Sequence, residues 1–359
     1  MIVTTRELNR ATLERQLLSR RAGRGVAETL EHLAGMQAQS PFSPYVGLWT
    51  RLEDFTPDAL AALLLDRSAV RTALMRGTVH LVTAADCLTL RPVLQRVLDR
   101  SLRANFGKRL DGLDLVAVAR AGRELVEDKP RTNRELGALL GEQWPDRDRA
   151  ALANVVRAAL PLVQLPPRAV WGRSGQSVLT TAEQWLGRPL SESTAPDRMV
   201  TRYLAAFGPA TVADAQKWSG LTRLREVVDR LPLRTLRGKD GEELFDVEHG
   251  SLPDRETEAP VRFLPEFDNL VVSYAAGDRV MSRQHRSRLM TANGIVRATV
   301  LVDGFVQGFW KIVKCRTRAR LEIEPLTTFP RKVGQDIETE GQRLLAFIAG
   351  DTTTRDVVC

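Results

Sequence analysis

Two glutamines separated by one residue, Gln37 and Gln39, are the side chains whose spacing best suits chemistry in this sequence. They follow a helical pattern and precede a turn marked by Pro41. Residues two apart in an extended segment point to the same side, so both amides could hold one water or one sugar while Ala38 faces the core. The spacing predicts an active site without a carboxylate. The alternative interpretation is a pair of solvated turn residues, because the pattern is common by chance.

The chain is basic, with a net charge of +8 over 359 residues. Of its 52 basic residues, 45 are arginine, whose planar fork binds two phosphate oxygens at once. This composition favours a polyanionic partner, and nucleic acid in particular. A coding bias toward arginine and alanine is the alternative explanation.

The composition disfavours several other classes of protein. Apolar residues make up 43% of the chain, yet no run approaches the ~18 residues that a membrane helix needs. The N-terminus begins with charged helical sequence, so we expect a cytoplasmic protein. The thiols Cys87, Cys315 and Cys359 are isolated and the four histidines are scattered, which predicts no disulfide, no metal site and no cofactor.

Helical and extended segments alternate in a repeated order that predicts an α+β fold. Within 132–181, two amphipathic helices, the first capped by Thr132, precede two extended segments. The same order recurs from Met199, with its last helix expected over 221–231, and the N-terminal stretch can be interpreted similarly. We predict three tandem winged-helix units, a class that commonly binds DNA but also serves in protein contacts. Their expected ranges are 1–115, 116–195 and 196–258.

Beyond Pro260 the pattern is mostly extended, with a hairpin turn at Asp303-Gly304. A helix is expected over 332–349, and the last ten residues are expected to fray. The pattern predicts a C-terminal β-barrel over 259–359. Its strands are expected at 263–264, 270–274, 296–302, 305–313 and 318–323.

Four stretches together resemble the AlkZ/YcaQ-like family of bacterial DNA glycosylases, which excise N-alkylated bases. The resemblance spans residues 36–304 and implies the same three winged helices and barrel around duplex DNA, in a nucleoid-associated protein. The family divides into Gln-x-Asp and Gln-x-Gln branches, and Gln39 indicates the branch associated with self-resistance to DNA-alkylating antibiotics. The stretches are Met36-Gln-Ala-Gln-Ser-Pro41, Met75-Arg-Gly-Thr-Val-His-Leu-Val82, Phe263-Leu-Pro-Glu-Phe-Asp-Asn-Leu270 and Val300-Leu-Val-Asp-Gly304.

Gln37 and Gln39 are the catalytic residues that this resemblance implies. The expected substrates are N7-alkylated purines in duplex DNA, including bulky and cross-linking adducts. Such a base carries a permanent positive charge and leaves neutral, so strong acid assistance is unnecessary. The amide oxygens could position a water and face the positive charge that develops on the deoxyribose. Because aromatic residues are only 6% of the chain, we expect a shallow, open site.

Three further residues are candidates for catalytic support. Glu266 and Asp268 are the carboxylates available as a general base, with a structural role as the alternative. His80 could hydrogen-bond near the site or contact a phosphate, or it could be a core histidine. No lysine lies near Gln37 in sequence, the nearest being Lys108, which favours a monofunctional glycosylase over one that forms a Schiff base.

Basic residues in two clusters, together with Arg76, are candidates for DNA binding. The first cluster lies between two predicted strands and could enter a narrow minor groove, or it could be a solvated hairpin tip. The second could hold phosphates or form a solvated helix face. The first comprises Arg283, His285, Arg286 and Arg288, and the second comprises Arg100, Arg103, Lys108 and Arg109.

Two other functions fit parts of this pattern. A winged-helix transcription regulator would bind DNA without catalysis, usually as a dimer on a two-fold site. Three such units and a barrel in one chain favour a monomer instead. A protein-interaction scaffold would show no salt-dependent DNA binding.

Overall fold

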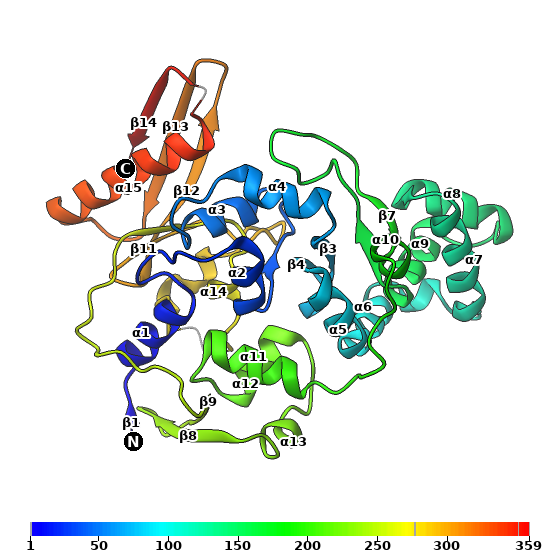
Figure 1. Cartoon of the computed structure of the whole chain (residues 1–359), viewed down its shortest axis with the longest axis horizontal. Helices are drawn as coiled ribbons and strands as arrows, with labels where there is room; N and C mark the ends of the chain where they lie inside the picture. The colour runs from blue at the N-terminus through cyan, green and yellow to red at the C-terminus, as the bar shows by residue number, and fades with distance from the viewer. Residues whose placement is uncertain (1, 276–277, 351, 359) are drawn as a thin grey trace.

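The computed structural model describes residues 2–275, 278–350 and 352–358, and it contains three separate sheets with helices around them (Figure 1). One sheet has six strands, one has five and one has three. The α+β class predicted from the sequence is confirmed. In the described ranges, no helix is long and apolar enough to cross a membrane.

The N-terminal part of the chain consists of short helices with strands between them. Its helices are α1 (Thr5–Arg15), α2 (Val26–His32), α3 (Ser43–Trp49), α4 (Pro57–Leu65), α5 (Ala84–Val93) and α6 (Gln95–Phe106), with the 3-10 turns η1 (Met75–Gly77) and η2 (Gly107–Arg109). Its strands are β1 (Ile2–Val3), β2 (Met36–Gln37), β3 (Ala69–Ala73) and β4 (Val79–Thr83).

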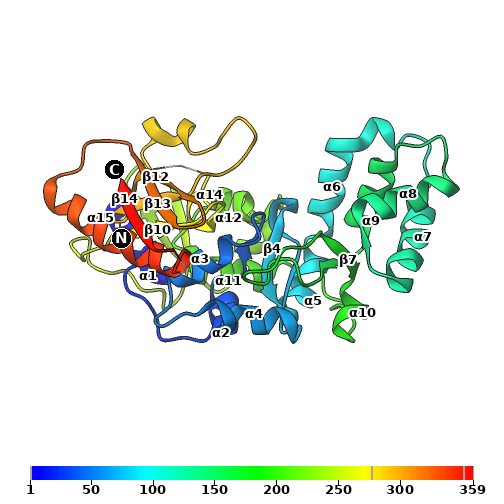
Figure 2. The same ribbon diagram turned by 90° about the horizontal axis from the view of Figure 1, so that it is seen from above.

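Within 132–181, the second predicted unit has the expected order of two helices followed by two strands, and α7 precedes them. As predicted, Thr132 forms a capping box with Glu135 at the start of α8. The strand β6 pairs with β3, so strands of the first two units share one sheet in the order β2-β4-β3-β6-β7-β5. The elements are α7 (Leu115–Asp128), β5 (Arg131–Thr132), α8 (Asn133–Gln143), α9 (Arg149–Ala159), β6 (Leu162–Gln164), β7 (Val178–Thr181) and α10 (Ala182–Leu186). Helices α6 to α9 gather at one end of the molecule (Figure 2).

The third unit corrects one predicted helix. Only four residues of the range 221–231 form an α-helix, because Gly220 ends the preceding helix with φ 82° and Arg223 has φ 61°. The strand β8 pairs in parallel with β1, so the N-terminus joins this unit. The elements are α11 (Asp197–Phe207), α12 (Val212–Ser219), α13 (Arg225–Val228), β8 (Leu233–Gly238) and β9 (Glu243–Val247).

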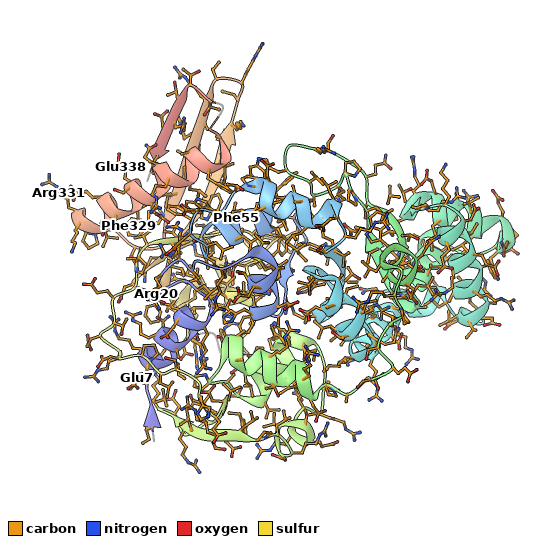
Figure 3. The ribbon with its side chains drawn as sticks, in the orientation of Figure 1. Glu7, Arg20, Phe55, Phe329, Arg331 and Glu338 are labelled. Atoms are coloured by element: carbon orange, nitrogen blue, oxygen red, sulfur yellow. The ribbon has the colours of Figure 1, made fainter. Side chains whose placement is uncertain are left out.

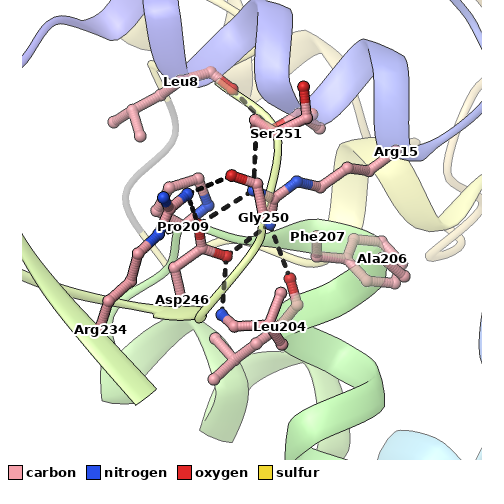
Figure 4. Close-up of polar contacts among 12 residues, drawn as sticks. Leu8, Arg15, Leu204, Ala206, Phe207, Pro209, Arg234, Asp246, Gly250 and Ser251 are labelled. Carbon is pink, nitrogen blue, oxygen red and sulfur yellow. Dashed lines mark hydrogen bonds and ion pairs between the residues drawn. The ribbon is translucent and has the colours of Figure 1, made fainter. Parts of the chain in front are cut away.

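A buried ion pair ties α1 to the third unit (Figure 4). Both terminal nitrogens of Arg15 donate to the carboxylate of Asp246, at 2.6 and 3.0 Å. Arg15 also donates to the carbonyl of Leu204 at 3.0 Å, and Arg234 binds the same carboxylate from β8. The contact explains how two segments distant in sequence keep a fixed relative position.

The C-terminal sheet is open, so the predicted barrel is wrong. Its five strands run in the order β10-β11-β12-β13-β14, and no pairing joins β10 to β14 in the described chain. Helix α15 packs on β10, β13 and β14 instead, which buries the apolar face that a barrel would enclose. The elements are β10 (Arg262–Leu264), α14 (Asn269–Val272), η3 (Arg283–Arg288), β11 (Thr299–Val302), β12 (Phe305–Lys314), β13 (Arg318–Pro325), α15 (Arg331–Ile348) and β14 (Thr354–Val358).

Aromatic contacts attach α15 to the N-terminal part of the chain. Phe347 stacks on Trp49 at a ring distance of 5.8 Å and lies 5.9 Å from Phe55. On its other side, α15 exposes Arg331 and Glu338 to solvent (Figure 3). The helix therefore joins the C-terminal sheet to α3 and the segment before α4.

Two further predictions in this region are wrong. The segment 270–274 begins in a helix rather than a strand, because Asp268 caps it by accepting a hydrogen bond from the Leu270 N–H at 3.0 Å. The last ten residues do not simply fray, since β14 pairs in parallel with β13; residues 351 and 359 lie outside the described chain. The hairpin turn at Asp303-Gly304 is confirmed between β11 and β12. The unit boundaries and the winged-helix assignment stay predictions.

Candidate active site

Gln37 lies on β2, directly opposite His80 on β4. The backbone N–H of Ala38 donates to the Val79 carbonyl at 2.8 Å, which continues the extended backbone beyond the strand. Ala38 is buried in the core, while Gln37 and Gln39 line one cavity. The arrangement predicted from their spacing is present.

The cavity has a volume of about 590 Å³ and is built from three distant parts of the chain. The N-terminal part contributes Arg76 and Thr78 beside the two glutamines, and α12 contributes Lys217. The remaining lining comes from residues within 267–272 and 286–296. The site therefore exists only in the folded chain.

Arg76 fixes the orientation of the Gln37 side chain. Its Nη2 donates to Gln37 Oε1 at 2.7 Å, and its Nη1 donates to the Trp218 carbonyl at 2.6 Å. Because a guanidinium has only donors, the amide oxygen of Gln37 must face it, and one lone pair of that oxygen remains. Burial lowers the pKa of Arg76 to about 10.

A second arginine holds the backbone between the two glutamines. The buried Arg71 donates to the Ala38 carbonyl at 2.7 Å and to Gln164 Oε1 at 2.6 Å. Burial lowers the pKa of Arg71 to about 10. Gln39 is exposed, and its Oε1 accepts from the Val79 N–H at 3.3 Å. Strands β3, β4 and β6 thus determine where both amides lie.

His80 is a fully buried histidine beside Gln37 on the neighbouring strand. Its Nδ1 lies 2.9 Å from the Thr78 carbonyl, which can only accept, so Nδ1 carries the proton. Burial, with a smaller contribution from Arg76, lowers the pKa of His80 to about 3. The ring is therefore neutral, and its Nε2 has no hydrogen-bond partner in the described chain. It is not part of the cavity lining.

The two candidate carboxylates lie in different environments. Asp268 is buried, with both oxygens 2.9 Å from nitrogens of Arg51, so it is engaged in structure. Glu266 is half-buried, and burial raises the pKa of its carboxyl. It makes no hydrogen bond or ion pair with the described residues, and its neighbour Phe267 lines the cavity. Glu266 itself is not among the residues that line the cavity, so a role in proton transfer stays a prediction.

The structure separates the members of the first basic cluster. Arg286 lines the cavity and donates to the Tyr274 carbonyl at 3.0 Å. Arg283 lines a different cavity of about 380 Å³, and Arg288 is paired with Glu324 at 2.6 Å. The cluster forms the 3-10 turn η3 rather than a hairpin tip, and His285 lies on it outside the cavity.

The second basic cluster lies on α6 and η2, outside the cavity. Arg100 and Arg103 are exposed on α6 and form no ion pair within the described ranges, and Lys108 is also exposed. Arg109 lies 3.4 Å from Asp148. Since α6 packs against η1, which carries Arg76, this surface is close to the site without lining it.

Sequence reasoning missed two parts of the cavity. The first is Lys217 on α12, which no local signal connects to Gln37. The segment 289–296 forms a small bridged turn that exposes Met290 and Ile295, with fractional exposures of 56% and 39%. Its Asn293-Gly294 dipeptide is a turn signal that could have indicated this hairpin.

The described residues contain no group of three or more His, Cys, Asp or Glu side chains placed to hold a metal ion. Cys87 is buried and Cys315 is exposed, both as free thiols, whereas Cys359 lies outside the described chain.

Comparison with known proteins agrees with a DNA glycosylase. The family described as DNA glycosylase AlkZ-like matches residues 30–347. The chain is 25% identical over 339 residues to the interstrand DNA cross-link repair glycosylase of Streptomyces sahachiroi, covering 84% of this chain and 86% of that relative. Its fold is similar to the solved structure of Streptomyces sahachiroi DNA glycosylase AlkZ, with a TM-score of 0.79 and 19% identity over 99% of both chains. Because the family match covers most of the chain, including the cavity, this protein belongs to the AlkZ-like DNA glycosylases and is an enzyme of that class.

Proposed function

We propose that this glycosylase excises N7-alkylated purines from duplex DNA by attack of water on the deoxyribose C1′. The observation that carries the proposal is the pair Gln37 and Gln39 in one cavity, with the Gln37 amide held in a single orientation by Arg76. The family match favours this enzyme over a transcription regulator.

The reaction moves a positive charge from the base to the sugar. An N7-alkylated purine leaves as a neutral base, so the enzyme has to support an oxocarbenium-like deoxyribose and deliver a water to it. The remaining lone pair of Gln37 Oε1 and the Gln39 amide can both bind that water. Positioning then contributes most of the rate, because the water is held next to C1′ before the bond breaks.

Glu266 is the proposed acceptor of the proton released by the attacking water. Its carboxyl has no partner in the described chain, and its raised pKa makes the carboxylate a better base. Asp268 cannot take this role without breaking its ion pair with Arg51.

The size of the cavity supports a bulky substrate. Ligand pockets of about 300–1,000 Å³ hold drug-sized molecules, and this cavity, at about 590 Å³, lies within that range. The Streptomyces sahachiroi relative is named for interstrand cross-link repair. We therefore propose that large N7 adducts and cross-links are substrates, in self-resistance to a DNA-alkylating antibiotic.

The proposed DNA-binding surface surrounds the cavity in a monomeric enzyme. Arg286 at the cavity and Arg100 and Arg103 on α6 would hold phosphates, since none of them is paired with a carboxylate in the described structure. Met290 and Ile295, which are exposed at the rim, would contact the bases next to the damaged nucleotide.

The test is release of 7-methylguanine, and of a bulky N7-guanine adduct, from duplex DNA by the purified protein. Gln37→Ala and Gln39→Ala should each lower the single-turnover rate by about a hundredfold or more, with DNA affinity nearly unchanged. Gln342→Ala, an exposed glutamine on α15, is the matched control and should behave like the wild type.

Two results would contradict the proposal. Intact DNA binding without release of either base would point to a non-catalytic DNA-binding protein. Equal losses of binding and release in the two glutamine variants would show that these residues are structural.

A further inference from the structure

The C-terminal sheet has an outer face that α15 does not cover. On β13, Ala319 and Leu321 are buried in a cluster with α15. Because successive side chains of a strand point to opposite faces, Arg318 and Arg320 lie on the face turned away from that helix, and both are exposed. The β12–β13 hairpin stands away from the rest of the molecule (Figure 1). With Arg316, which is exposed in its turn, they form the arginine row.

The arginine row is not neutralised by the protein. Its three members form no ion pair within the described ranges. Asp356 lies beside Arg320 in the register of β14, yet no ion pair joins the two there. The next acidic residue of β13 on this face, Glu322, is bound by Lys311 at 2.9 Å. The row therefore has no partner that would give it a role in stability, and its charge is available to a ligand.

The outer face of β13 leads from the row back to the cavity. Its residue Glu324 binds Arg288 at 2.6 Å and also pairs with Arg297. These two arginines directly adjoin Leu289 and Val296 in the chain, and both of those residues line the cavity. One face of a single strand thus connects the rim of the cavity to the arginine row.

The length of this face can be compared with the repeat of DNA. Arg318 is six residues from Glu324 on β13, which corresponds to about 20 Å of extended chain. Each strand of a duplex carries one phosphate per ~3.4 Å of helix axis, so the same distance spans about six base pairs. Arginine is suited to such a ligand, since its planar fork binds two phosphate oxygens at once.

We propose that the arginine row is a second DNA-binding site, which holds the phosphate backbone about six base pairs from the damaged nucleotide. The proposal rests on the proposed function only in that duplex DNA occupies the cavity. Its contacts are electrostatic and independent of base sequence, because each phosphate that an arginine neutralises releases condensed counterions. The row extends from the cavity in one direction, so it holds the duplex on one side of the lesion.

The first test measures binding of the full-length protein to an undamaged duplex of about 30 base pairs, between about 50 and 200 mM salt. The double variant Arg318→Gln/Arg320→Gln should bind at least about tenfold more weakly at about 0.1 M salt. The slope of log K against log salt should also decrease by about 2, because two phosphate contacts are lost. Arg331→Gln/Lys332→Gln removes the same charge from α15, on the other face of the sheet, and should behave like the wild type.

The second test locates the contact relative to the lesion. A tetrahydrofuran abasic analogue, which contains no base to release, is placed in a duplex with arms of about twelve base pairs, and each arm in turn is shortened to about four. Shortening one arm should weaken binding by the wild type much more than by the double variant. Shortening the other arm should affect both proteins equally.

Three results would overturn the proposal. Equal affinity of the double variant and the wild type for the long duplex would point to an acidic protein as the ligand of the row. Equal weakening by the control variant would show a general effect of net charge. A loss of affinity that does not depend on either arm would place the contact elsewhere. Because binding to undamaged DNA requires no excision, the first test is independent of which base the enzyme releases.

Discussion

Buried arginines in two regions of the molecule have different kinds of hydrogen-bond partner. Where α1 and the segment after α3 meet later parts of the chain, Arg15 and Arg51 are each paired with both oxygens of a carboxylate. Arg51 binds Asp268, with both distances 2.9 Å, and Arg15 binds Asp246. Beside Gln37 and Gln39, Arg71 and Arg76 bind only uncharged oxygens, two from amide side chains and two from backbone carbonyls.

The two kinds of partner suit two different roles, stabilising the fold and binding a substrate. A buried arginine with a carboxylate partner joins distant segments and leaves little net charge. Arg71 and Arg76 hold the active-site segment while keeping their positive charge, and burial lowers the pKa of both to about 10. An unneutralised charge is unfavourable for folding, but it is useful where a polyanionic substrate must be held.

The largest effect is expected from breaking a paired arginine. Asp268→Ala leaves the Arg51 charge buried without its partner and removes the cap of α14. The free energy of unfolding should fall by roughly 3–5 kcal/mol, measured by urea denaturation. The double variant with Arg51→Ala should recover part of this loss. A loss below about 1 kcal/mol in the single variant would show that the pair does not stabilise the fold.

Removing an unpaired arginine should affect catalysis more than stability. Arg76→Met eliminates a buried charge but leaves Gln37 Oε1 and the Trp218 carbonyl without their donor, at a cost of about 1–2 kcal/mol. The single-turnover excision rate should fall by about 10- to 100-fold, because the Gln37 amide is no longer held in place.

Two further variants make this test specific. Arg76→Lys restores a charge but not both hydrogen bonds, so it should recover DNA affinity more than rate. Arg198→Met, exposed on α11 and outside the cavity, should behave like the wild type. A normal rate in Arg76→Met would contradict the positioning role.

The smallest effect concerns pH and the neutral His80 beside Arg76. Histidine titrates near pH 6.5 in the unfolded chain, whereas burial lowers the pKa of His80 to about 3 in the folded protein. Between these values the unfolded chain binds the extra proton. The free energy of unfolding is therefore unaffected by His80 above about pH 6.5. Below that pH it decreases by up to about 1.4 kcal/mol per pH unit as the pH falls.

Urea denaturation at pH 7 and pH 5 measures this effect. The wild type should lose roughly 2 kcal/mol more than His80→Asn between the two values, since the variant lacks the titrating group. The same pH dependence in both proteins would mean that His80 is protonated in the folded state.

Local signals in the sequence were sufficient for several elements. Thr132 forms a capping box where the pattern places a helix start, and Asp303-Gly304 forms the expected hairpin turn. The side-by-side placement of Gln37 and Gln39 follows from extended backbone alone. These features depend on residues a few positions apart, so propensity and hydrogen bonding within the segment are decisive.

Other predictions failed where a contact outside the local pattern decided the outcome. The apolar segment 270–274 suited a strand, but Asp268, held by the distant Arg51, caps a helix there. The C-terminal strands suited a barrel, but α15 covers their apolar face and leaves the sheet open.

By itself, the sequence determined the α+β class, the glutamine pair and the Thr132 cap of α8, because these depend on neighbouring residues. Only the tertiary structure decided that Arg286 and Lys217 lie at the glutamines, that Asp268 is bound to Arg51, and that His80 is buried and neutral. The physical reason is that side-chain chemistry depends on burial and on partners far away in sequence, which no local pattern encodes.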